Sequence, residues 1–278
     1  MKKYKPTTPS RRSMTTVPYR ELLSGDARYK PLTKGITSHA GRNHRGVITT
    51  RHKGGGVKKL YRIVDFKQSK MNVPGRVATI EKDPYRNAFI SRIIFADGEQ
   101  SYILAVKGLA VGDTIITQEK APLKNGNRMM LKHIPVGTFV SNIEMNPGSG
   151  GKIARAAGAY AEVLAHEGKF TNLKIGSKEV RRIVSTALAT IGQISNPDYN
   201  LTTFGKAGKS RWKGIRPTVR GSAMNPVDHP YGGGEGRQPR GTKRPKTKWG
   251  KVTGGRKTRK SKKWSTKLIV SRRTSKRK

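Results

Sequence analysis

A chain of 278 residues, 33% of them hydrophobic and none of them cysteine, can form one large or two small domains with small cores, no disulfides and no thiolate metal sites. Its 59 Lys and Arg residues against 16 Asp and Glu give a net charge of +43, which predicts a polyanionic partner and favours nucleic acid over an anionic membrane. No apolar run approaches the roughly 20 residues that span a bilayer, and the Met-Lys-Lys-Tyr-Lys-Pro start lacks an apolar signal segment, so we expect a cytoplasmic protein.

The positive charge is concentrated at the two ends of the chain. Residues 1–60 carry a net +13, residues 206–278 carry +23, and the long segment between them carries only +7. Both ends are rich in Gly and Pro and poor in apolar residues, so they lack the means to fold alone. We therefore predict a globular centre between two basic extensions, at 1–59 and 201–278, which need a partner to order them.

Residues 60–124 show the pattern of a small β-barrel. Short runs of β-branched and aromatic residues occur at 61–66, 77–80, 89–95, 102–106 and 114–117. The Asp97-Gly98 pair between two of these runs is a strong hairpin signal. About five short strands of this kind suit a closed barrel of the oligonucleotide-binding type.

Residues 125–200 form a second β-rich segment. Short strands are predicted at 139–145, 160–165, 170–175, 180–185 and 189–194, with a glycine-bearing loop at 147–151. Their regular spacing predicts a second small barrel, and their apolar residues are assigned to its core. The predicted fold class is therefore mainly β, with two barrels between long basic extensions.

The C-terminal extension contains the loop on which the functional interpretation depends, residues 221–241. Three X-Pro steps disfavour helix and strand there, and Gly232, Gly233 and Gly234 allow a partner to approach the backbone closely. Arginines around the loop carry guanidinium groups suited to phosphate. One or two helical turns are predicted within 205–214, and a basic tail follows the loop.

No nucleotide-binding or metal motif is complete. Gly208-Lys209-Ser210 lacks the earlier glycine and the strand–helix context of a P-loop, and the glycines of 232–236 lack the context of a dinucleotide site. His39, His44 and His52 are better explained as solvated or phosphate-facing groups than as metal ligands, because they lie in a basic extension. We expect no cofactor held by protein ligands.

Asp228 and His229 form the one pair that suggests acid–base chemistry. A histidine beside a carboxylate could act as a general base. Residues adjacent in sequence, however, rarely face each other, and no nucleophile accompanies this pair. We therefore expect both side chains to fix the loop or to contact RNA.

A long motif at residues 205–237 carries a specific resemblance. It reads G-K-A-G-K-S-R-W-K-G-I-R-P-T-V-R-G-S-A-M-N-P-V-D-H-P-Y-G-G-G-E-G-R, and it is supported by A-G-R-N at 40–43, R-H-K-G-G-G at 51–56 and A-D-G-E at 96–99. Over essentially its whole length the chain resembles the bacterial large-subunit ribosomal protein L2 family. The resemblance implies an oligonucleotide-binding barrel, an SH3-like barrel and two extensions embedded in RNA.

The resemblance also implies a function. It indicates a structural constituent of the large ribosomal subunit that binds its rRNA as a primary step and supports subunit association, tRNA binding and the peptidyl-transferase centre. Expected partners are large-subunit rRNA, small-subunit rRNA at the intersubunit bridge and neighbouring ribosomal proteins, with no membrane. We expect the rRNA to catalyse peptide-bond formation, and Mg²⁺ to accompany the rRNA.

One position departs from the family pattern. The family often has histidine where this chain has Tyr231, so a proposal that needs two imidazoles does not suit this chain. The family histidine most often discussed for peptidyl transfer corresponds to His229. We prefer a supporting role for His229 and assign no catalytic residue.

The predicted RNA-binding residues are cations, loop glycines and polar loop side chains of the two extensions. They are Arg42, Arg45, Arg51, His52, Lys53, Lys58, Lys206, Lys209, Arg211, Trp212, Lys213, Arg216, Arg220, Asn225, Asp228, His229, Gly232, Gly233, Gly234, Arg237, Arg240, Lys243 and Arg244.

Two other classes of protein stay open from the residues alone. An architectural DNA-binding protein could also use two barrels with basic extensions, but a flexible glycine-rich loop suits an irregular RNA surface better than a duplex groove. An RNA-modifying enzyme requires a cofactor motif or a catalytic constellation, and the sequence contains neither.

Overall fold

The chain folds into two compact units. The computed structural model describes residues 1–25, 28–255 and 258–273. The barrel unit comprises Met1–Thr37, Lys58–Lys206 and Lys267–Lys278, and the basic unit comprises Ser38–Val57 and Ala207–Thr266. The chain thus leaves the barrel unit twice and returns to it twice. The four linear domains drawn from the sequence, 1–59, 60–124, 125–200 and 201–278, stay a prediction.

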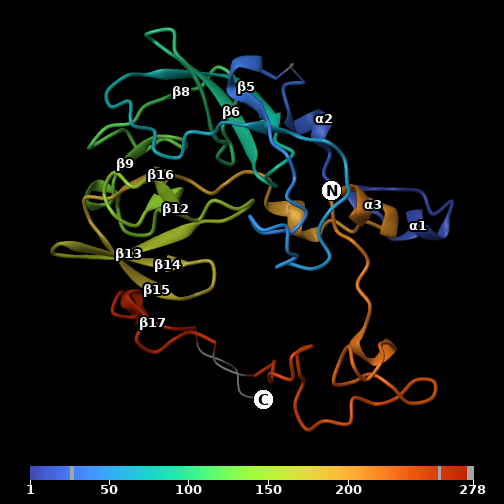
Figure 1. Cartoon of the computed structure of the whole chain (residues 1–278). Coiled ribbons are helices and arrows are strands. Elements are labelled where there is room, and N and C mark those ends of the chain that lie inside the picture. Colours follow the sequence, from blue (N-terminus) through green and yellow to red (C-terminus); the bar gives the residue numbers. More distant parts are fainter. Residues whose placement is uncertain (26–27, 256–257, 274–278) are drawn as a thin grey trace. The chain divides into compact units, whose positions relative to one another are not determined.

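The first barrel is built on a four-stranded antiparallel sheet (Figure 1). Its order is β7-β6-β5-β8, and the strands are β5 (Gly75–Lys82), β6 (Phe89–Phe95), β7 (Gln100–Leu104) and β8 (Thr114–Ile115). Alternate residues of β5 are buried, as the period-2 pattern predicts. The predicted turn between β6 and β7 is confirmed, since Gly98 has a φ of 83° and its N–H donates to the Phe95 carbonyl at 2.9 Å.

The second barrel is built on a seven-stranded antiparallel sheet. Its order is β17-β15-β14-β13-β10-β16-β9, and the strands are β9 (Arg128–Met130), β10 (Phe139–Ser141), β13 (Ala161–Glu167), β14 (Phe170–Ile175), β15 (Val180–Val184), β16 (Leu188–Ile191) and β17 (Ile269–Ser271). A short pair, β11 (Ile143–Glu144) and β12 (Gly151–Ile153), completes it. The core contains fully buried Leu131, Val140, Val163 and Leu173.

The fold is mainly β, with curled sheets that match an oligonucleotide-binding-type barrel and an SH3-like barrel, as predicted. The predicted strands of both barrels are present with shifted ends: β5 extends to both sides of the predicted 77–80, whereas β8 stops two residues before the predicted end at 117. Three strands of the second barrel were missed. β9 and β12 are short and lie beside connectors rich in glycine, and β17 lies in the basic tail, where only its partner β15 makes it a strand.

The first 37 residues differ from the featureless extension that we expected. They contain β1 (Lys2–Lys3), α1 (Pro9–Arg12), β2 (Thr15–Thr16), α2 (Tyr19–Leu22) and β3 (Thr33–Gly35), and β3 pairs with β4 (Leu60–Arg62). Val17 is only 3% exposed and packs with Phe89 and Ala105. Local periodicity is weak here because the order comes from contacts with the barrel.

A buried hydrogen-bond group ties residue 29 to the first barrel. The Tyr102 hydroxyl is fully buried, donates to the Glu81 carboxylate at 2.9 Å and accepts the Tyr29 N–H at 3.0 Å. Burial, aided by the Glu81 charge and opposed by the Tyr29 N–H, raises the pKa of Tyr102 to about 12. The phenol therefore stays protonated and holds both partners.

The second barrel contains a fully buried ion pair. Arg128 Nη2 lies 3.1 Å from Glu144 Oε1, with the side chains 0% and 1% exposed. Arg128 also donates to the Asn142 carbonyl at 2.7 Å, while Glu144 accepts the N–H groups of Gly148 at 3.0 Å and Leu188 at 3.4 Å. Burial lowers the pKa of Arg128, and the Glu144 charge opposes that effect. Each of the two buried charges is therefore stabilised by the other.

We predict that Glu144→Ala destabilises the protein by about 3–5 kcal/mol, because it leaves the Arg128 guanidinium buried without its counter-charge. Equilibrium unfolding in urea, monitored by the circular dichroism of the β-sheets, measures the change in the free energy of unfolding. The matched control is Glu162→Ala, which breaks a more exposed pair with Lys174 (3.0 Å) and should cost under about 1 kcal/mol. Equal losses from the two variants would contradict the assignment of a structural role to the buried pair.

Candidate nucleic-acid interface

The basic unit carries more positive charge per residue than the chain as a whole. Its two segments contain 22 Lys and Arg residues and only two carboxylates, Asp228 and Glu235, so it carries +20 in 80 residues. Two carboxylates can offset only two of these 22 cations. The charge is therefore left to be neutralised from outside.

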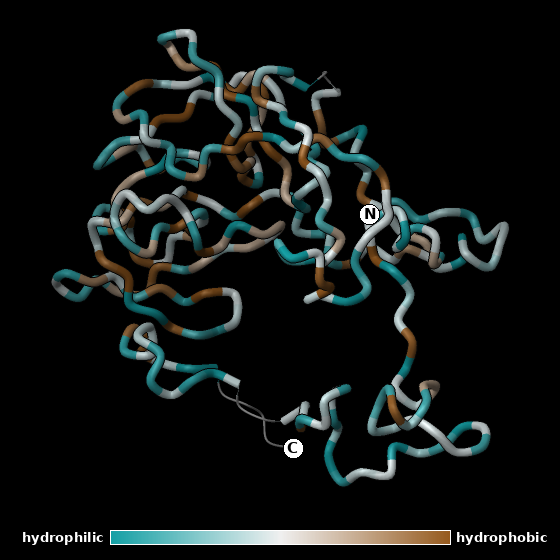
Figure 2. Tube along the Cα trace, in the orientation of Figure 1, coloured by the Kyte–Doolittle hydropathy of each residue, from teal (hydrophilic) through white to brown (hydrophobic). Residues whose placement is uncertain are grey.

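The basic unit also lacks a hydrophobic core. All the buried hydrophobic residues that the structure describes belong to the barrel unit. In the basic unit Val227 is 97% exposed, Trp249 71% and Trp264 60%. Figure 2 shows the same contrast along the chain, with the basic unit mostly hydrophilic or intermediate. Burial of apolar area thus cannot be what holds this unit together.

Backbone contacts join the two segments of the basic unit instead. The Gly54 N–H donates to the Gly214 carbonyl at 3.0 Å, the Val57 N–H to the Trp212 carbonyl at 3.1 Å, and the Arg216 N–H to the His52 carbonyl at 3.0 Å. A Cβ at Gly56 would lie 2.8 Å from the Trp212 carbonyl oxygen. The run of three glycines therefore permits a backbone approach that side chains would block.

The arginines beside this junction are exposed. The predicted helical turns are confirmed as α3 (Ala207–Trp212), and Arg211, Arg216 and Arg220 lie at its end and beyond it. All three are exposed, and none forms an ion pair within the described part of the chain. Their guanidinium groups are available for a phosphate backbone.

The loop at 221–241 folds onto its own backbone. The Asn225 carbonyl accepts the N–H groups of Asp228 at 2.9 Å and His229 at 3.3 Å, and the Gly233 N–H donates to the Met224 carbonyl at 3.0 Å. A Cβ at Gly232 would lie 2.2 Å from the Asn225 oxygen. A single 3₁₀ turn at its start, Gly221–Ala223, is the exception to the expected lack of helix.

His229 is held by the loop rather than by its acidic neighbour. Its Nδ1 accepts the Tyr231 N–H at 3.1 Å, so the neutral ring carries its proton on Nε2. Gly221 lies against the ring, where a Cβ would be 2.5 Å from Nδ1. Asp228 is exposed and has no hydrogen bond to the imidazole in the described structure. The arrangement contains no carboxylate–imidazole pair.

The structure gathers most of the predicted RNA-binding residues into one unit. All of them lie in the basic unit except Lys58 and Lys206, which lie in the barrel unit. His39, His44 and His52 share the basic unit, and within the residues described no group of three or more His, Asp or Glu is placed to hold a metal ion.

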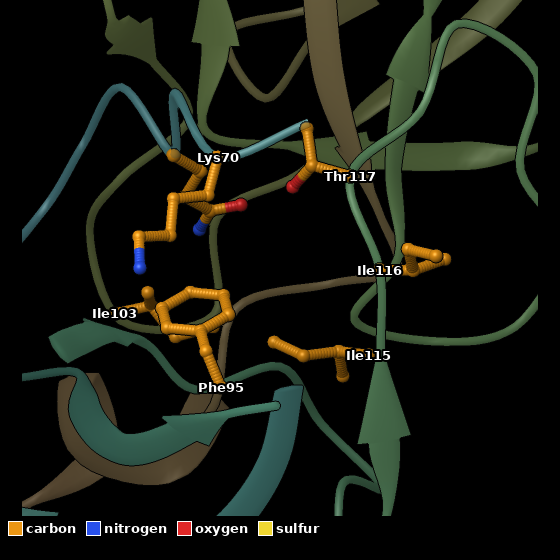
Figure 3. Close-up of a pocket in the computed structure, with 7 residues that line it drawn as sticks. Lys70, Phe95, Ile103, Ile115, Ile116 and Thr117 are labelled. Atoms are coloured by element: carbon orange, nitrogen blue, oxygen red, sulfur yellow. The ribbon is translucent and has the colours of Figure 1, made fainter. Parts of the chain in front are cut away.

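A small pocket lies in the barrel unit (Figure 3). It is lined mainly by apolar side chains, among them Phe95, Ile103 and Ile115. Its cation, Lys70, is engaged, because its ammonium pairs with Asp97 and lies 5.0 Å from the Phe95 ring centroid. The hydrogen bond with Asp97 raises the pKa of Lys70, which keeps it charged. Its apolar lining belongs to the core of the first barrel.

Sequence reasoning missed a strip of rings and cations on the barrel unit. The Arg86 guanidinium lies 5.7 Å from the ring centroids of Tyr61 and Phe66, and Arg155 lies 4.5 Å from that of Phe66. Lys59 lies 5.9 Å from the exposed Tyr85 ring. Such alternation suits a nucleic-acid strand. No local signal could reveal it, because the residues come from positions 59 to 155.

Two family models match this chain. Ribosomal Proteins L2, RNA binding N-terminal domain, matches residues 29–117, and Ribosomal Proteins L2, C-terminal domain, matches residues 124–250. Together they cover most of the chain. The chain belongs to the ribosomal protein L2 family. It is therefore a structural protein of the large ribosomal subunit, with rRNA and ribosomal proteins as partners.

The L2 matches agree with the two-barrel architecture. The N-terminal match covers the first sheet together with the whole 38–57 segment, and the C-terminal match covers the second sheet up to β16 and the loop at 221–241. Strand β17 lies beyond both. None of the helices described in this L2 chain has the length and apolar character to cross a membrane.

We predict that in the free protein a protease of broad specificity cuts first within 38–57 and 207–266, because these segments lack buried apolar contacts. The resistant product should contain most of residues 58–200 and retain 1–25, which the structure packs on the barrel. Mass spectrometry of a proteinase K time course identifies the cuts. Early cleavage inside β5, β6, β13 or β14, with an intact basic unit, would be inconsistent with this division.

Proposed function

We propose that the basic unit is the main anchor of this protein on large-subunit rRNA and that it binds chiefly through phosphate contacts. The observation that carries the proposal is a unit with a charge of +20, only two carboxylates, and no buried hydrophobic side chain among its described residues. Such a unit gains its order from a polyanion. Membership of a ribosomal family makes rRNA that polyanion.

The finer roles follow from the family and from the shape of the loop. We propose that the loop at 221–241 enters the rRNA near the peptidyl-transferase centre, and that the protein supports subunit association through small-subunit rRNA and supports tRNA binding. The rRNA catalyses peptide-bond formation, and Mg²⁺ is bound with the rRNA. The particle is cytoplasmic. DNA is the weaker candidate partner, because the loop has no helix or strand to fit a groove.

Within the loop, we propose that His229 supports structure. Its Nδ1 is used by the Tyr231 N–H, and the ring fills the space beside Gly221. The ring thus presents one outward donor, the Nε2 proton, which suits an RNA oxygen. A base would instead need a free lone pair at that position.

Replacing Arg211, Arg216 and Arg220 together with alanine should weaken rRNA binding and flatten its dependence on salt. Each lost phosphate contact removes about 0.7–0.9 from the slope of log K against log salt concentration, so the slope should fall by about 2–3. Filter binding of the full chain to large-subunit rRNA from low to high salt measures both quantities.

The matched control removes the same charge from cations that already have carboxylate partners. Lys174, Arg181 and Arg182 pair with Glu162, Glu179 and Glu167 in the barrel unit. Their triple alanine variant should keep the slope nearly unchanged. Equal slopes for the two triple variants would show that total charge, rather than contacts of the basic unit, governs binding.

His229→Gln should assemble into particles and retain most of their peptide-bond formation, because the amide can accept the Tyr231 N–H and donate outward but cannot titrate near neutral pH. His229→Ala should assemble poorly, since the loop loses the side chain that packs on Gly221. Single-turnover peptide-bond formation across pH, on fully assembled particles, is the measurement.

Asp228→Asn serves as a neighbouring control with no imidazole change. A collapse of the chemical step in normally assembled His229→Gln particles, with an altered pH dependence, would reject the supporting role and indicate proton transfer.

A further inference from the structure

Tyr231 connects the loop at 221–241 to the residues that follow it. Its phenol oxygen accepts the Lys246 N–H and the Thr242 hydroxyl at 3.5 Å. Its ring centroid lies 4.9 Å from that of His229 and 5.9 Å from the Arg240 guanidinium carbon. The Thr242 hydrogen bond, more than the Lys246 N–H, lowers the pKa of Tyr231, as expected for an oxygen that accepts.

The segment held by Tyr231 leads into a tight hairpin. Lys246 pairs with Val252, and the Thr247 N–H donates to the Lys251 carbonyl at 2.8 Å. The hairpin places Trp249 beside Arg51, whose guanidinium lies 5.8 Å from the indole ring. Arg51 precedes the glycine run that binds the backbone at 212–216. The contacts of Tyr231 therefore extend through the hairpin to the other segment of the basic unit.

We propose that Tyr231 is a positioning residue that holds the cations of residues 240–246 as one phosphate-binding surface beside His229. The inference rests on the proposed role of the basic unit in rRNA binding. Arg240, Lys243 and Arg244 are exposed, and no hydrophobic core fixes them. The phenol hydroxyl supplies the contact that orders their backbone as the unit folds on the RNA. A histidine at position 231 lacks that oxygen.

Positioning and direct contact predict different salt behaviour. Tyr231→Phe removes no cation, so the slope of log K against log salt should stay unchanged while affinity falls by about three- to tenfold at every salt concentration. The arginine variants above should change the slope. Binding of the full chain to large-subunit rRNA provides both numbers.

Amide hydrogen exchange in the rRNA complex supplies a local readout. In Tyr231→Phe the Lys246 N–H should exchange faster, because its acceptor is gone, while the Gly233 N–H, which donates to the Met224 carbonyl, should keep its protection. Tyr160→Phe is the matched control. It removes a hydroxyl that makes no hydrogen bond within the described structure, and it should change neither affinity nor exchange.

Two results would overturn the inference. Unchanged affinity with unchanged Lys246 exchange would show that the phenol oxygen orders nothing. A slope reduced by about one unit would place Tyr231 itself among the phosphate contacts. Either result can occur while the arginine triple variant still flattens the slope, so the failure of this inference is distinguishable from failure of the proposed function.

Discussion

Uncompensated positive charge is the constraint on which the basic unit depends. Its Lys and Arg side chains repel one another, and among its described residues no buried apolar side chain opposes that repulsion. The internal contacts described for it are hydrogen bonds, such as those from Gly54 to Gly214 and from Lys246 to Tyr231, and ring contacts such as Arg51 on Trp249. These define a shape but contribute little stability in water. In the binding mode proposed here a phosphate backbone supplies the missing counter-charge, so we expect folding of this unit and binding of RNA to be one process.

The barrel unit, in contrast, is stabilised by its own buried side chains and paired charges. Its sheets bury aliphatic side chains, and its interior charges are matched, as Arg128 is by Glu144. Several of its surface cations also have carboxylate partners, including Lys174 and Arg182. A self-sufficient fold can therefore carry the strip of Arg86, Arg155 and their aromatic neighbours at fixed spacing. We therefore expect the basic unit to adapt to the RNA and the barrel unit to offer it a preformed surface.

The sequence predicted those strands and turns whose formation depends on residues close together in the chain. Alternation identified β5, β6, β13 and β14, and Asp97-Gly98 identified a hairpin. Structure that depends on contacts between distant residues could not be predicted from the sequence. Strand β17 forms by pairing with β15, and Val17 is buried by packing with Phe89 and Ala105. The same holds for the candidate interface. Composition located its arginines and glycines, but the link from Tyr231 to Lys246 depends on a chain reversal that no spacing rule encodes.

The tautomer of His229 connects the shape of the loop to its chemistry. Acting as an outward base would require a bare Nε2 and hence a proton on Nδ1, which would then face the Tyr231 N–H 3.1 Å away. Two donors would oppose each other, and the turn from His229 to Gly232 would lose one of the few bonds that define it. Because no buried hydrophobic residue is described in the loop, it is held mainly by such hydrogen bonds, and the loss of one would weaken it. The geometry that makes this loop a defined surface for RNA is thus the geometry that commits its imidazole to donating a hydrogen bond.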